Sequence, residues 1–225
     1  GGRIHARQPG PGGGACPVSE RQHPGLNLHG TDSGTHAQAA PSLFGFWVFL
    51  MADLILFALL LATYGSMVVH GRAGGPGPGE LFDLGPALVQ TLLLLGSSLT
   101  IGMAMLHVKY QQDRNGLLLW LAATALLGLA FLVLEARDFH TLVVDEGAPP
   151  QRSGFLSAYF LLTGTHWLHV AAGCLWMAVL GVQRVVIGLE SDVKLRLLRL
   201  GLYWHLLDIV WVAIFTFVFL FGLTS

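Results

Sequence analysis

Five long apolar runs follow one another along the chain, separated by short polar stretches. A helix needs about 20 predominantly apolar residues to cross the hydrocarbon core of a bilayer, and each run is long enough to do so. Short connections place consecutive helices antiparallel to one another. The pattern therefore predicts an all-α integral membrane bundle of five transmembrane helices, at residues 43–69, 85–107, 116–134, 154–182 and 201–223.

Residues 1–41 have a different character. They are rich in Gly, Pro, Ser, His and Gln and lack apolar periodicity, so they predict a disordered polar tail ahead of a transmembrane domain at 42–225. Metal binding by the tail histidines is an alternative, but their irregular spacing favours a solvated tail. These histidines are His5, His23, His29 and His36.

Composition supports the membrane class. Of the 225 residues, 53% are hydrophobic and 11% are charged, whereas a soluble domain carries about 25% charged residues. The net charge of −1 gives no basic field for nucleic acid. Cys16 and Cys174 lie far apart and match neither a disulfide framework nor a zinc motif.

The distribution of basic residues predicts an orientation. Of 12 Lys and Arg residues, nine lie in the N-terminal tail and in the second and fourth loops, on one side of the predicted membrane. Because cytoplasmic segments carry the excess of Lys and Arg, the N-terminus is expected inside and the C-terminus outside.

Several ionisable side chains fall inside the apolar runs, where a charge costs about 2.5–3.5 kcal/mol on insertion scales. Asp53 and Asp208 are expected at similar depth, about 12–15 Å from the inner surface at 1.5 Å per residue. His166 and His169 are three residues apart and share a helix face, as do His205 and Asp208.

Three interpretations of these residues stay open. Haem or metal ligation is one, although the same counting puts His169 and His205 at different depths, about 21 Å and about 8 Å. A proton or ion path is another. The interpretation that we favour is a set of interhelical hydrogen bonds and ion pairs that fix packing within a larger assembly.

Other features have simpler interpretations. The small residues of 91–102, including Ser98 and Gly102, are typical of close helix packing. Arg184, at the inner end of the fourth run, is a candidate for a lipid headgroup contact, because a guanidinium pairs well with phosphate. No phosphate-binding Gly loop and no Ser/His/Asp set occur, so the sequence predicts no catalytic centre and no metal site.

Four stretches carry a resemblance to a known family. They are FGFWVFLMADLILFALLLATYGSMV, GRAGGPGPGELFDL with LVQTLLLLGSSLTIGM, RSGFLSAYF with GTHWLHVAAGCLWMAVL, and YWHLLDIVWVAIFTFVFLFG. From about residue 43 to its end the chain resembles subunit III of the haem-copper respiratory oxidases, in particular their ubiquinol-oxidising cytochrome o branch. It departs from the family at Ala52, where Ser is frequent, and at Trp167, where a small residue is common.

The resemblance implies a supporting role in a bacterial inner-membrane complex that oxidises quinol, reduces oxygen to water and pumps protons. Haem and copper are then expected in subunit I, with no cofactor in this chain and bound phospholipid between its helices. Subunit I is the expected main partner, together with subunits II and IV. The family-matching intramembrane polar positions, with roles in packing, lipid binding, oxygen access or proton supply, are Asp53, Glu135, His166, His169, His205 and Asp208.

Three alternatives remain beside that role. The same subunit of a cytochrome c oxidase would also fit, because some of these enzymes have five helices in this subunit. An independent proton-coupled transporter is a second alternative, and a membrane haem or metal enzyme is a third.

Overall fold

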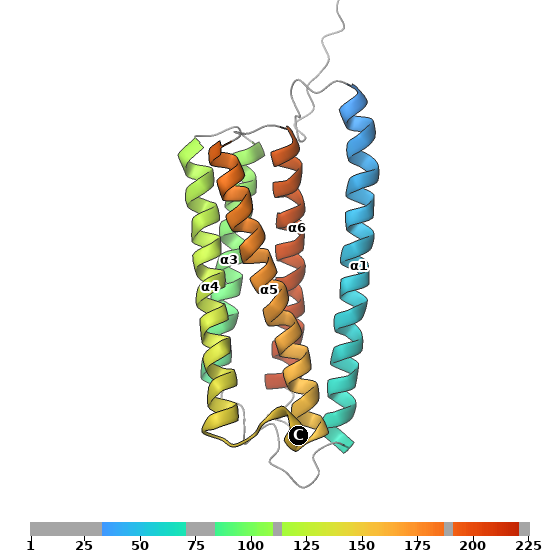
Figure 1. The fold of residues 1–225 in the computed structure, drawn as a ribbon, viewed down its shortest axis with the longest axis vertical. Coiled ribbons are helices and arrows are strands. Elements are labelled where there is room, and N and C mark those ends of the chain that lie inside the picture. Colours follow the sequence, from blue (N-terminus) through green and yellow to red (C-terminus); the bar gives the residue numbers. More distant parts are fainter. Residues whose placement is uncertain (1–32, 71–83, 110–113, 187–190, 221–225) are drawn as a thin grey trace, which may run out of the picture.

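The computed structural model describes residues 33–70, 84–109, 114–186 and 191–220, which form a bundle of long helices (Figure 1). A short 3-10 helix η1 (Pro150–Arg152) precedes α5, and the π-helix η2 (Phe215–Leu220) continues α6. Each long helix contains a stretch long and apolar enough to cross a membrane, so the prediction of five spanning helices is confirmed. The long helices are α1 (Ser33–His70), α3 (Leu84–Lys109), α4 (Arg114–Val144), α5 (Gly154–Val186) and α6 (Ser191–Ile214).

The helices extend beyond the apolar runs at three ends. α1 begins at Ser33, upstream of the boundary predicted at residue 42, while residues 1–32 lie outside the described part of the chain. α4 continues past residue 134 to Val144, and α6 begins at Ser191 rather than at residue 201. Hydropathy marks only the part of a helix that suits lipid, whereas backbone hydrogen bonds continue through polar residues.

α6 is the central helix of the bundle. It packs against α1, α3 and α5, while α4 pairs with α3 and α5 on the side away from α1 (Figure 1). α1 stands at the edge and packs mainly against α5 and α6. In the most apolar stretch of each helix, 61% of α6 is buried within the bundle against 17% of α1.

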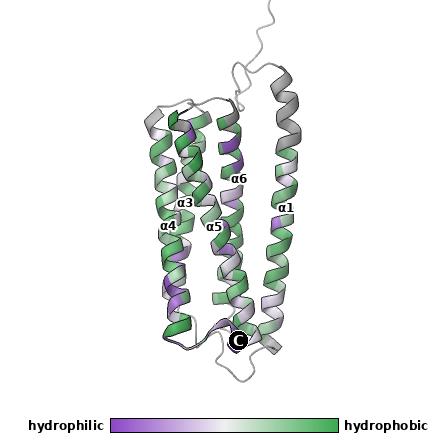
Figure 2. Ribbon diagram, in the orientation of Figure 1, coloured by the Kyte–Doolittle hydropathy of each residue, from purple (hydrophilic) through white to green (hydrophobic). Residues whose placement is uncertain are grey.

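The outer surface of the described helices is apolar. Figure 2 shows hydrophobic residues along all five helices, with hydrophilic ones gathered in the upper part of α6 and the lower part of α4. Leu59 and Leu126 are 65% and 70% exposed on this surface. Such a surface suits lipid or apolar partner helices, because every backbone polar group of a helix is satisfied internally.

Two glycines let the indole of Trp204 enter the core between α4 and α5. A Cβ atom at Gly128 would lie 2.9 Å from the Trp204 ring, and one at Gly173 would lie 2.8 Å from it. Both distances are too short for carbon atoms in contact. Trp204 is consequently only 2% exposed and forms the centre of the core.

Candidate functional site

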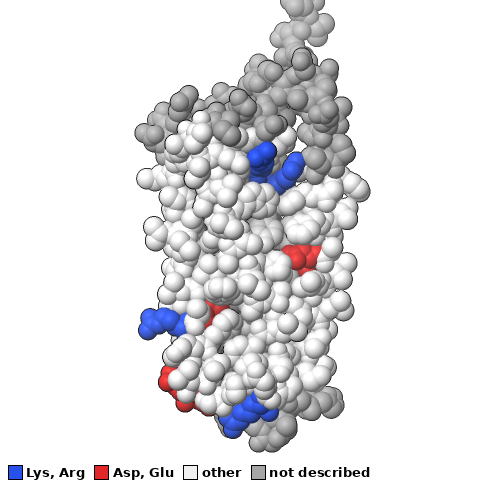
Figure 3. Space-filling model, viewed as in Figure 1, with Lys and Arg blue, Asp and Glu red and all other residues white. Residues whose placement is uncertain are grey.

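Asp53 of α1 and His169 of α5 form an ion-pair contact inside the membrane-spanning part of the bundle. His169 Nε2 lies 3.1 Å from Asp53 Oδ1, and the two side chains are 24% and 6% exposed. Phe57, one turn after Asp53 on α1, places its ring against the imidazole at a centroid distance of 5.2 Å. Figure 3 shows an acidic patch on the side of α1, within a largely uncharged face.

His169 also bonds its own helix through its other ring nitrogen. Nδ1 lies 2.7 Å from the carbonyl oxygen of Thr165, which can only accept, so Nδ1 carries a hydrogen. A hydrogen on Nε2 or on the Asp53 carboxyl group would make the contact between Nε2 and Oδ1 a hydrogen bond.

His166 shares a face of α5 with His169 but has different partners. It is fully buried, and its Nε2 donates to the carbonyl oxygen of Leu207 in α6 at 3.1 Å. Three aromatic rings surround it, at centroid distances between 5.2 and 6.1 Å, and they belong to Phe57, Phe131 and Trp211. His166 thus ties α5 to α6, whereas His169 ties α5 to α1.

His205 and Asp208 of α6 both face Ser98 of α3. Ser98 Oγ lies 2.8 Å from His205 Nδ1. Asp208 is 9% exposed and lies near Ser98 and His205, while its Oδ1 accepts no hydrogen bond from the described residues. The shared helix face that the spacing predicted here is therefore directed at α3.

Two tryptophans of α6 add hydrogen bonds to the same contact between α3 and α6, which we call the α3–α6 seam. Trp204 Nε1 donates to Ser97 Oγ at 2.9 Å, and Trp211 Nε1 donates to Thr91 Oγ1 at 3.1 Å. The sequence interpretation of residues 91–102 as close packing missed these acceptors. The spacing of these residues was a signal in the sequence. Trp204 and Trp211 are seven residues apart and Thr91 and Ser97 are six apart, so two antiparallel helices can bring both pairs together.

Trp167, one of the departures from the family pattern, lies between the two histidines of α5. Its Nε1 donates to the carbonyl oxygen of Leu132 in α4 at 3.0 Å. The large side chain therefore adds a link between α5 and α4 at a position where the resembling family commonly has a small residue.

Glu135 lies apart from the histidines, towards the C-terminal end of α4, and is 2% exposed. Gln90 of α3 is its neighbour and donates from Nε2 to Asp138 Oδ2 at 2.7 Å. Gln90 and Asp138 were not among the residues predicted from the sequence. The three-residue spacing between Glu135 and Asp138 was the signal for the latter.

The polar positions thus form separate interhelical contacts. Asp53 and His169 meet, His205 and Asp208 share Ser98, and Glu135 belongs to another group. Within the described residues no three His, Cys, Asp or Glu side chains gather as a ligand set for one metal ion. The side chain of Arg184 lies outside the described residues, as do all the residues of the tail up to residue 32.

Comparison with known proteins gives the family. Residues 25–223 match the model of cytochrome c oxidase subunit III. The chain is 46% identical over 194 residues to the cytochrome bo(3) ubiquinol oxidase subunit 3 of Pseudomonas aeruginosa, covering 86% of this chain and 89% of that protein. It is 40% identical over 182 residues to the quinol oxidase subunit 3 of Bacillus subtilis, covering 81% of this chain and 88% of that protein. The chain is a member of the cytochrome c oxidase subunit III family.

Proposed function

We propose that this chain is the non-catalytic subunit III of a quinol-oxidising, proton-pumping terminal oxidase in a bacterial inner membrane. The observation that carries the proposal is the family match over most of the chain, to relatives that are named quinol oxidase subunits. The pairing of the described intramembrane polar groups with each other across helices agrees with a supporting role.

The proposed partners follow from that role. Subunit I is the main partner, where haem and copper reside, and subunits II and IV complete the complex. The N-terminus is inside and the C-terminus outside, so Arg184 is at the inner surface and contacts a phospholipid headgroup. The exposed apolar faces of the bundle supply the surface for lipid and for subunit I.

Purification of the native assembly tests the proposal. We expect haem-bearing and copper-bearing chains to co-purify with this one, and a complex without haem would overturn the proposal. The electron donor is decided by the partner subunit II. A bound copper pair there would indicate cytochrome c as donor, and its absence supports quinol.

Asp208→Asn tests the supporting role at one residue. The substitution keeps the size of the side chain and removes its charge beside Ser98 and His205. We expect weaker retention of this chain in the complex or a shorter active life of the oxidase, with unchanged haem spectra. A change in haem content of the assembled complex would contradict a role confined to support.

Within this role we assign Asp53 and His169 to proton supply from the inner side. The contact supports this assignment because it places a carboxyl group and an imidazole 3.1 Å apart in the membrane-spanning part of the chain. In the assembled oxidase, Asp53→Asn is expected to alter the pH dependence of turnover. An unchanged pH dependence would leave the pair with a packing role alone.

A further inference from the structure

A second polar cluster lies where α3 begins and α4 approaches its end, and nothing in the proposed role accounts for it. It consists of Gln90, Glu135 and Asp138. Gln90 and Glu135 are 1% and 2% exposed, whereas Asp138 is half-buried. Glu135 and Asp138 share a face of α4, and Gln90 reaches them from α3, with its Nε2 bound to Asp138 Oδ2 at 2.7 Å.

Two oxygen atoms in this cluster lack a hydrogen-bond donor. They are Glu135 Oε1 and Gln90 Oε1, and no side chain or backbone group of the described residues donates to either. Buried polar atoms are nearly always paired, so each such atom calls for an explanation. Since a carboxylate oxygen and an amide oxygen both accept, the missing partner must bring a hydrogen or a positive charge.

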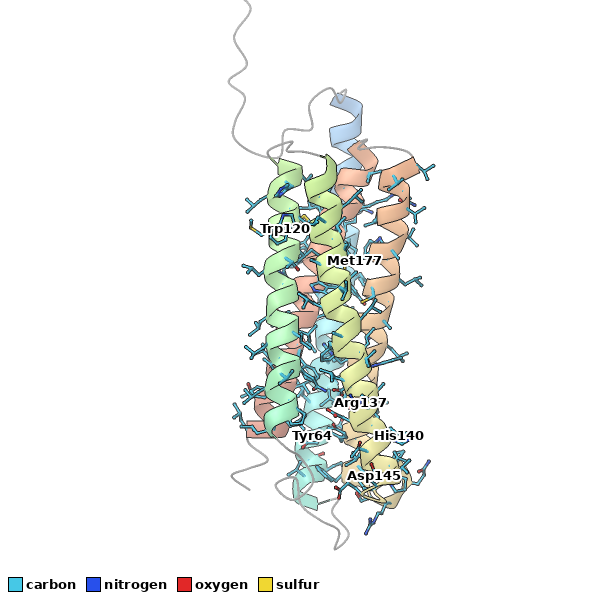
Figure 4. The ribbon with its side chains drawn as sticks, turned by 90° about the vertical axis from the view of Figure 1, so that its left-hand side faces the viewer. Tyr64, Trp120, Arg137, His140, Asp145 and Met177 are labelled. Atoms are coloured by element: carbon cyan, nitrogen blue, oxygen red, sulfur yellow. The ribbon has the colours of Figure 1, made fainter. Side chains whose placement is uncertain are left out.

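The surroundings provide no such charge. Asp138 places a like charge beside Glu135, and Tyr159 of α5 faces both carboxyl groups, with Tyr64 of α1 next to it. Among the described residues, the basic group that acts on the pair is Arg137, which is exposed and affects Asp138 rather than Glu135. Figure 4 shows Arg137 and Tyr64 towards this end of the bundle. Two adjacent carboxylates in a membrane-spanning segment are costly when both are ionised.

One proton can satisfy both oxygen atoms. When a proton binds Glu135 Oε1, the carboxylate becomes a neutral acid whose O–H is a donor, and the neighbouring Gln90 side chain offers Oε1 as an acceptor. Gln90 Nε2 meanwhile remains on Asp138, which keeps its negative charge. Asp138 is half-buried whereas Glu135 and Gln90 are buried, so Asp138 is the member of the cluster that water can reach.

We propose that Glu135, Gln90 and Asp138 form a proton-binding site, with Glu135 as the group that holds the proton and Asp138 as its exit to water. The site lies on α3 and α4, away from the Asp53–His169 contact between α1 and α5. It goes beyond the proposed function, because binding of a proton by these side chains does not depend on which complex the chain joins.

Infrared spectroscopy of the chain in its native assembly tests the site. A protonated carboxylic acid has a C=O stretching band that a carboxylate lacks. At neutral pH we expect such a band in the unsubstituted protein, lost in Glu135→Gln and displaced in Gln90→Leu and Asp138→Asn, which alter its surroundings. Asp145→Asn is the matched control, because Asp145 is an exposed acid at the same end of the bundle and its removal should leave the band unchanged (Figure 4).

A second measurement needs no variant. Carbon-13 labelling of glutamate carboxyl groups should shift the same band in the unsubstituted protein, and labelling of aspartate should not. A band that survives Glu135→Gln, or that moves only with labelled aspartate, would overturn the assignment. Loss of the band on addition of sodium chloride at constant pH would also overturn it, in favour of a cation site.

Discussion

The α3–α6 seam and the α1–α5 seam hold helices together in different ways. Along α3 and α6 the contacts are hydrogen bonds from Trp204 and Trp211 to hydroxyl groups, in a region that is almost fully buried. Between α1 and α5 the polar contact is Asp53 with His169, and most of α1 faces outward. Both seams also contain ionisable side chains, since His205 bonds Ser98 in the first and Asp53 meets His169 in the second. The first seam lies in the buried centre of the bundle, whereas the second lies at its edge.

The largest expected effect comes from removing the centre of the α3–α6 seam. Trp204→Ala deletes a buried indole and its bond to Ser97, and large aromatic-to-alanine changes in cores cost about 3–5 kcal/mol. We expect a lower thermal stability of the purified chain and its loss from the assembly. Trp47→Ala is the control, since Trp47 is 53% exposed on α1. Equal effects of the two substitutions would remove the distinction between the seams.

The next effect concerns the polar contact at the α1–α5 seam. Asp53→Leu leaves His169 Nε2 without its partner, and an unpaired buried polar group costs about 1–3 kcal/mol. Since His169 is 24% exposed, the expected loss lies near the lower end of that range. Asp53→Asn should lie closer to the unsubstituted chain, because an amide N–H can donate to Nε2. Thermal unfolding of both variants checks the order. Equal losses would mean that the carboxylate charge, rather than hydrogen bonding, stabilises the seam.

A smaller effect on stability is expected from one hydrogen bond of the α3–α6 seam. Trp211→Phe keeps an aromatic ring against His166 but removes the donor to Thr91, for which about 0.5–1.5 kcal/mol is typical. Trp176→Phe is a suitable control, because the Trp176 indole nitrogen bonds none of the described residues. The free energies of unfolding of the two variants should differ by the contribution of this hydrogen bond. A Trp211→Phe variant as stable as the control would show that ring packing alone maintains the seam.

The smallest effect should come from the outer face of α1. Leu59 is 65% exposed, so Leu59→Ala should change the stability of the isolated chain by less than about 0.5 kcal/mol. Phe57→Ala, two residues earlier and 1% exposed, should destabilise the same chain strongly. The free energies of unfolding of the two variants check which face of α1 packs against the bundle. Similar losses of stability would contradict the observed packing.

Counting residues from the helix ends failed to predict which polar groups meet. It put His169 deeper in the membrane than Asp53, yet their side chains are 3.1 Å apart. The counting treated all the helices as upright and level, whereas α5 runs obliquely across the bundle (Figure 1) and α1 begins at Ser33, ten residues before the first apolar run. The depth of a residue depends on the tilt and offset of its helix, and these are set by packing between helices.

The sequence by itself determined the five spanning helices, because apolar length must match the thickness of a bilayer whatever the helices pack against. It also identified the buried acids and histidines, since a polar residue in an apolar run stands out without any knowledge of its partners. Only the tertiary structure decided that His166 and His169 tie α5 to different helices, and that Glu135 belongs with Gln90 and Asp138. Those pairings depend on how each helix is rotated about its axis, and the rotation is fixed by the side chains of its neighbours.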